Sequence, residues 1–273
     1  MKIRAERAEG TTYKSNSGIT DNSNSNISAD LSTDIYHNES CGELTPELVK
    51  IKNDIVLIYY DPETSGLRLS ADILQIAAKA GKYQFSVYVT PTQNIDADAS
   101  AQTKLTNIGE KLYYKGVLVE NISLQRAMIA FYEFLAIFNH KCLLIAHNGK
   151  AFDPRLVRAF QTHGILDMFE KVIHGFSDSL PMFKALYPDR KGPEMFKLGT
   201  LAKDLLRITG NLHEATFEVA ILEKLCNNFM LIDKIFTNSV IFADTLHKEL
   251  NKQNVASKLP DLAIFKRITS ITV

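Results

Sequence analysis

The stretch IVLIYYDPETSGL, residues 55–67, is the most informative part of the chain because two acidic residues follow a buried strand. The run from Ile55 to Tyr60 is apolar and aromatic throughout, which is typical of a strand covered on both faces. Side chains alternate along a strand, so Asp61 and Glu63 leave one face, roughly 6–7 Å apart. Two such anions repel each other and resist desolvation, and a divalent cation between them would explain the pair. The alternative is a solvated turn, because Pro, Ser and Gly favour turns.

The composition is that of a globular protein. The chain has 273 residues, 45% of them hydrophobic and 23% charged, and its formal net charge is zero. Basic residues gather between Lys141 and Arg207, which is either a modest basic surface or an ordinary set of solvated helix faces. No segment reaches the roughly 18–20 apolar residues of a membrane span, and no apolar signal core follows Met1. We therefore expect an intracellular protein of the nucleus or cytoplasm, without a membrane partner.

Composition divides the chain into three parts. Residues 10–45 are dominated by Gly, Thr, Ser, Asn and Asp. Such a stretch cannot bury enough apolar surface to offset the entropy of ordering, so residues 1–47 are predicted to be a disordered leader. Residues 48–230 carry the strand and helix patterns of a folded domain. Residues 231–273 are predicted to be a helical extension, packed on the domain or trailing from it.

The order of elements predicts an α/β fold. Residues 73–80 and 83–89 are typical of two strands joined by a tight turn at Gly81, which form an antiparallel meander with the first strand. Residues 91–103 are expected to be a loop. The other expected elements are a buried strand at 142–146 and helices at 122–138, 153–162, 180–186, 198–206, 214–229 and from 231 through 251. This order indicates a mixed sheet, an antiparallel meander followed by parallel strands, flanked by helices.

Two further segments carry acids at positions where α/β sheets place their sites. Asp153 follows the strand at 142–146 and precedes Pro154. Taken alone it is better explained as a helix N-cap than as a ligand, although the two roles are compatible. His213 and Glu218 are five residues apart, about 140° around a helix, so they converge only if His213 lies on the loop before the helix. A pair of surface residues is the alternative.

In this order and approximate spacing, the three segments resemble the DEDDh group of 3′–5′ exonucleases, which have the ribonuclease H-like fold. The matching residues are Asp61, Glu63, Thr64 and Gly66 in the first motif, His147, Asn148 and Asp153 in the second, and His213 and Glu218 in the third. The second segment is most similar to the three-prime repair exonucleases. Residues 178–206 are similar to the exonuclease-like domain of a promyelocytic leukaemia protein isoform. The resemblance covers about residues 52–228.

The resemblance implies a metal-dependent 3′–5′ exonuclease that acts on the 3′ ends of DNA or RNA. It implies two Mg²⁺ or Mn²⁺ ions held by Asp61, Glu63, Asp153 and Glu218. Carboxylate oxygens are the ligands that these hard cations prefer, and a pair of ions can stabilise both the attacking and the leaving oxygen. It makes His213 the group that takes a proton from the attacking water. The residues expected to contact the terminal nucleotide or its backbone are Thr64, Ser65, Gly66, Leu67 and Asn148.

Two residues depart from the motif pattern. Glu218 stands where the family has Asp, and the extra methylene moves the carboxylate by roughly 1–1.5 Å although Mg²⁺ requires strict geometry. Pro62 lies between the first two acids and donates no backbone hydrogen bond, so it suits a strand end or edge. Both departures keep an alternative open, a nucleic-acid-binding or scaffold protein that has the exonuclease fold with weakened catalysis.

Overall fold

A computed structural model describes residues 49–209 and 214–252 of the chain. The predicted leader, residues 1–47, and the last part of the predicted extension, residues 253–273, lie outside the described residues. Among the helices of the described part, none has the length and apolar character that a membrane crossing requires.

The main sheet is mixed, as the order of elements predicts. Its strands are β1 (Ile51–Lys52), β2 (Ile55–Thr64), β3 (Ile73–Ala80), β4 (Tyr83–Tyr88), β8 (Lys141–Ala146), β9 (Ile173–Asp178) and β10 (Val240–Ile241). The strand order is β10-β9-β8-β2-β3-β4, and β1 pairs with β2. Strands β2, β3 and β4 form the antiparallel meander, whereas β2, β8 and β9 run parallel. The sheet is therefore the antiparallel-then-parallel arrangement of a ribonuclease H-like fold.

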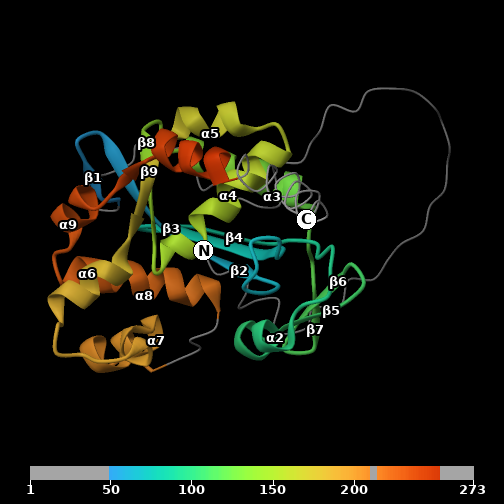
Figure 1. The fold of residues 1–273 in the computed structure, drawn as a ribbon, viewed down its shortest axis with the longest axis horizontal. Coiled ribbons are helices and arrows are strands. Elements are labelled where there is room, and N and C mark those ends of the chain that lie inside the picture. Colours follow the sequence, from blue (N-terminus) through green and yellow to red (C-terminus); the bar gives the residue numbers. More distant parts are fainter. Residues whose placement is uncertain (1–48, 210–213, 253–273) are drawn as a thin grey trace, which may run out of the picture. The chain divides into compact units, whose positions relative to one another are not determined.

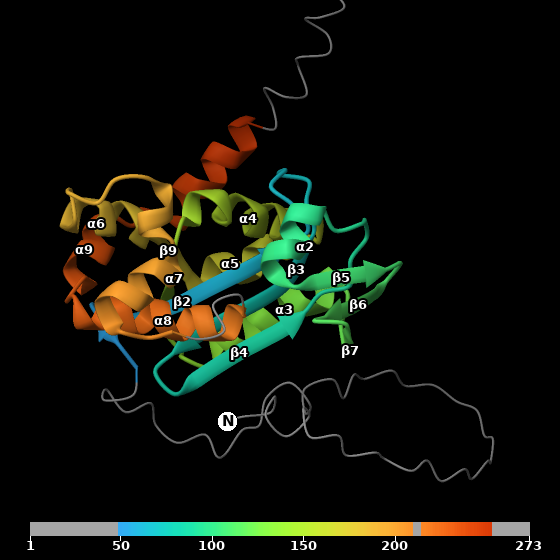
Figure 2. The same ribbon diagram turned by 90° about the horizontal axis from the view of Figure 1, so that it is seen from below.

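Helices cover both faces of this sheet, which lies between the two layers in Figure 1. The α-helices are α2 (Ala97–Thr103), α3 (Leu124–Ala136), α4 (Asp153–Thr162), α5 (Leu166–Val172), α6 (Ser179–Leu186), α7 (Leu198–Leu201), α8 (Ala215–Asn228) and α9 (Ile232–Thr237). Helix α8 lies across β2 and β3, as Figure 2 shows from below. The core on this face joins α6, α7, α8 and α9 to the sheet through Leu57 and Tyr59. On the opposite face, α3 and α5 bring Phe131 and Phe169 together.

Two parts of the chain differ from the expected elements before residue 120. The expected loop at 91–103 contains α2, and a second sheet follows it, made of β5 (Leu105–Ile108), β6 (Lys111–Tyr114) and β7 (Val117–Val119). Leu105 and Leu112 of this small sheet are fully buried against Leu74 of β3. The strands of the small sheet are short and contribute few apolar residues, so its sequence lacks the long apolar runs by which the main strands are recognised.

The region after residue 231 also differs from the expected continuous helix. Helix α9 ends at Thr237, β10 pairs antiparallel with β9, and a second helix occupies residues 242–252. This pairing needs Gly175 of β9, because a Cβ there would lie 2.2 Å from the carbonyl oxygen of Val240. Phe242 then stacks near Phe176 on the sheet. The described part of the predicted extension therefore packs on the domain.

Candidate metal centre

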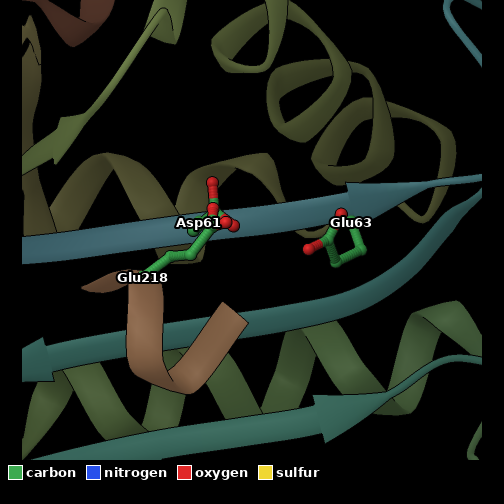
Figure 3. A group of neighbouring side chains, drawn as sticks. All are labelled: Asp61, Glu63 and Glu218. Atoms are coloured by element: carbon green, nitrogen blue, oxygen red, sulfur yellow. The ribbon is translucent and has the colours of Figure 1, made fainter. Parts of the chain in front are cut away.

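Strand β2 and helix α8 bring three acidic side chains together. Asp61 and Glu63 lie beyond Tyr59, the last residue of β2 that pairs with β8. They share a strand face with Tyr59, which packs in the core beneath α8. Glu218 lies in the first turn of α8. One carboxylate oxygen from each of Asp61, Glu63 and Glu218 lies within 4.8 Å of the others, and all three residues are half-buried. Figure 3 shows Glu218 reaching from its helix to Asp61 beside the strand.

The strand end also accommodates Pro62. Its register partner in β3 is Ile76, and on its other side β2 has already separated from β8. The missing N–H therefore removes no hydrogen bond between β2 and β8. Pro62 fits the strand end without disturbing the two acids that flank it.

The electrostatics of this group favour a positive charge. Burial raises the pKa of Glu63 to about 7 and, together with the nearby charge of Glu63, raises that of Glu218 to about 8. Burial and the carboxylates of Glu218 and Glu63 raise the pKa of Asp61 well above its usual range. Asp61 and Glu218 share a side-chain hydrogen bond, which requires a proton between two groups that are ordinarily ionised. A divalent cation could replace that proton and neutralise the group.

The structure places Asp153 apart from these three acids. It is the first residue of α4 and is buried, and its Oδ1 accepts a hydrogen bond from the hydroxyl of Tyr60. Burial raises the pKa of Asp153 to about 7, against the opposing effect of this hydrogen bond. Within the described residues, Asp153 is not a member of the group formed by Asp61, Glu63 and Glu218.

The residues expected to contact the nucleotide form a closed loop after β2. The Ser65 hydroxyl accepts a hydrogen bond from the Asp72 backbone N–H at 2.8 Å, and Thr64 donates to the Gly66 carbonyl at 3.0 Å. Leu67 is 96% exposed, so an apolar side chain stands free at the edge of the site. An exposed apolar side chain of this kind could contact the face of a base.

Arg155 of α4 holds the same loop, and sequence reasoning did not find it. The residue is 7% exposed, and its guanidinium donates to the carbonyls of Leu67 at 2.6 Å and Arg68 at 2.9 Å. It also donates to the carbonyl of Ala151 at 2.6 Å. A guanidinium carries five N–H donors in a fixed planar arrangement, so one arginine can bind several carbonyl oxygens at once. The only signal in the sequence was an arginine within an otherwise buried helix face.

His147 and Asn148, which belong to the second motif, form hydrogen bonds that hold the chain in place after β8. The ring of His147 is hydrogen-bonded to the Ser179 hydroxyl at 2.8 Å and to the Phe196 carbonyl at 2.7 Å. Asn148 has a left-handed backbone, with φ of 67°, and its N–H donates to the carboxylate of Asp178 at 2.9 Å. Asn148 itself remains exposed, so its side chain can contact a substrate.

His213 of the third motif lies outside the described residues, which resume at residue 214.

The chain is similar to a family model and to several known proteins. The family model described as the Exuperantia RNAse H-like domain matches residues 55–205, which is more than half of the chain. The maternal protein exuperantia-1 of Drosophila pseudoobscura pseudoobscura is 25% identical over 164 residues, covering 55% of this chain and 33% of the relative. The maternal protein exuperantia of Drosophila virilis is 26% identical over 151 residues, covering 50% of this chain and 31% of the relative.

The matched region thus spans about a third of the length of these relatives. Among solved structures, exonuclease X in complex with 5′ overhanging duplex DNA is 19% identical with a TM-score of 0.41, covering 63% of this chain and 92% of the other. The family match confirms the ribonuclease H-like fold predicted from the three motifs. The chain belongs to the family of Exuperantia RNAse H-like domains.

Proposed function

We propose that this protein is a divalent-metal-dependent 3′–5′ exonuclease that removes nucleotides from nucleic-acid 3′ ends. The observation that carries the proposal is the convergence of Asp61, Glu63 and Glu218, whose carboxylate oxygens lie within 4.8 Å of one another. Carboxylates that are half-buried and share a hydrogen bond are costly to keep ionised without a cation. The all-oxygen donor set suits Mg²⁺ or Mn²⁺ rather than a softer metal.

Each residue has a distinct role in the proposed reaction. Asp61, Glu63 and Glu218 would hold one cation at the end of β2, and Asp153 would complete the ligand set for a second cation only after it leaves its contact with Tyr60. The bound ions would polarise the scissile phosphodiester and its attacking water. His213 is the proposed acceptor of the water proton, since an imidazole nitrogen can act as a general base.

The substrate contacts belong to the loop after β2 and to the turn after β8. Thr64, Ser65, Gly66 and Leu67 approach the terminal nucleotide, and Asn148 contacts the nucleic-acid backbone. Arg155 fixes the carbonyls of Leu67 and Arg68, so this loop is ordered before substrate binds. Pre-ordering of this kind reduces the entropy lost on binding.

The test is degradation of 5′-labelled single- and double-stranded DNA and RNA by the full chain. We expect stepwise shortening from the 3′ end and release of 5′-mononucleotides with Mg²⁺ or Mn²⁺, and no reaction in the presence of a chelator. A 3′-blocked substrate is the control, and its degradation at the same rate would contradict attack at the 3′ end. Absence of product with either metal on all four substrates would contradict the proposal.

A nucleic-acid-binding or scaffold protein with weakened catalysis is the second candidate. The position of Asp153 favours it, because this carboxylate is bonded to Tyr60 and is not part of the three-acid group. Such a protein would bind nucleic acid without turnover.

Exchange of Glu218 for Asp separates the two candidates. In the structure the long side chain of Glu218 reaches the carboxyl group of Asp61. If the site is active, Glu218→Asp retracts the carboxylate by roughly 1–1.5 Å and lowers the affinity for Mn²⁺ and the rate by about tenfold. A large gain in rate in the same assay would show instead that Glu218 weakens the wild-type site.

A further inference from the structure

The hydroxyl of Tyr60 determines where the carboxylate of Asp153 lies. Tyr60 is fully buried in β2, and its hydroxyl donates a hydrogen bond to Oδ1 of Asp153 at the start of α4. Tyr60 and Asp61 are consecutive residues of one strand, so their side chains leave opposite faces of the sheet. The hydrogen bond therefore holds the Asp153 carboxylate toward the α4 side of β2, while Asp61 faces α8 together with Glu218. Beyond Tyr59, β2 no longer pairs with β8, so β8 does not block the way around this end of β2.

Gly149 makes room for the carboxylate in this position. It opens the short 3₁₀ turn Gly149–Ala151 between β8 and α4. A Cβ at Gly149 would lie 3.2 Å from both carboxylate oxygens of Asp153, which is tighter than most such contacts. The carboxylate of Asp153 is thus held between the Tyr60 hydroxyl and the backbone of Gly149. Its negative charge also lies at the N-terminal end of α4, where the helix dipole favours an anion.

We propose that Tyr60 is a positioning residue that withholds Asp153 from the metal centre. While the hydrogen bond is in place, Asp61, Glu63 and Glu218 bind a single divalent cation. A second cation binds only after Asp153 leaves Tyr60 and moves toward the three-acid group. This inference rests on the proposed function, because it assumes that the three acids bind metal.

The physical basis is competition for one carboxylate. Breaking this hydrogen bond would leave the buried hydroxyl of Tyr60 without its partner, which costs free energy. A second cation must offset that loss before it can recruit Asp153. Tyr60→Phe removes the competing donor while it retains the ring and the packing of β2.

The test is the stoichiometry of Mn²⁺ binding to the full chain, measured by calorimetry and by electron paramagnetic resonance of the free ion. In the absence of nucleic acid, we expect one Mn²⁺ for the wild type and two for Tyr60→Phe. The double variant Tyr60→Phe with Asp153→Asn should return to one, because the gained site uses Asp153. In the wild-type background, Asp153→Asn should leave the first affinity within about twofold, whereas Glu63→Gln should weaken it by about tenfold or more.

Tyr59→Phe is a matched control. Tyr59 is the preceding residue and is equally buried, but among the described residues its hydroxyl has no hydrogen-bond partner. This variant should bind one Mn²⁺ like the wild type.

Three outcomes would each overturn the role of Tyr60: two ions in the wild type, one ion in Tyr60→Phe, or a loss of the first ion in Asp153→Asn. Absence of Mn²⁺ binding by the wild type would overturn the proposed function itself. If Tyr60→Phe does not fold, the Mn²⁺ affinity of Asp153→Asn still tests the proposal, because loss of the first ion in that variant would contradict it.

Discussion

Replacement of Asp61 by Asn should abolish metal-dependent degradation of nucleic acid while it leaves the fold intact. Asp61 is central to the acidic group, since it shares a hydrogen bond with Glu218 and lies two residues from Glu63 on the same strand face. An amide retains the shape of the side chain but removes a charged ligand. A bound metal supplies several kcal/mol of transition-state stabilisation, so we expect the rate to fall by about 10³-fold or more. The measurement is the rate of mononucleotide release in Mn²⁺ under single-turnover conditions.

The fold should become more stable in the same variant when metal is absent. The amide that replaces the Asp61 carboxyl group cannot ionise, so the repulsion within the acidic group is reduced. Urea unfolding in chelator should therefore give a higher midpoint for Asp61→Asn than for the wild type. Asp189→Asn is the control, because Asp189 is exposed in the turn after α6, and neither rate nor midpoint should change. Full activity in Asp61→Asn would contradict the assignment of Asp61 as a metal ligand.

The sequence was sufficient to predict the elements that rest on long apolar runs and clear helical periodicity. Strands β2, β3, β4 and β8 and helices α3, α4 and α8 lie within a few residues of their expected bounds. Strand β9 was not expected, because IHGFSD is short and has a glycine near its centre. That glycine is required by β10, whose backbone approaches too closely for any side chain. A contact between segments so distant in sequence has no local signature.

In the candidate site too, local sequence patterns predict some positions, whereas others depend on contacts between distant segments. The period of a strand places Asp61 and Glu63 on one face, and the structure adds Glu218 to them, three of the four predicted metal ligands. The position of Asp153 depends on the hydroxyl of Tyr60, a hydrogen bond between residues 93 positions apart. By its apolar neighbours in the sequence, Tyr60 resembles an ordinary core aromatic. Its place directly before Asp61, and hence on the opposite face, was the one available signal.

Without metal, the protein should lose stability as the pH rises from about 4.5 to about 8, and Mn²⁺ should restore it. The folded-state pKa values of Glu63, about 7, and Glu218, about 8, lie above the ordinary value of 4.5. Above pH 4.5 the unfolded chain releases these protons while the folded protein retains them. The free energy of unfolding is therefore highest below the unfolded pKa and falls until the pH exceeds the folded pKa. For Glu63 alone the shift corresponds to about 3 kcal/mol, as an order of magnitude.

Urea unfolding across this pH range, in chelator and in Mn²⁺, measures the effect. Metal binds the ionised carboxylates of the folded protein, so the decline with pH should flatten when Mn²⁺ is present. Glu63→Gln should reduce the slope in chelator, because one shifted group is removed. Glu170→Gln, at an exposed position in α5, should leave the slope unchanged. Stability that rises between pH 5 and pH 8 in chelator would mean that these carboxylates are ionised and well solvated in the folded protein. The acidic group would then have no need of a cation, and the metal centre would lose its physical basis.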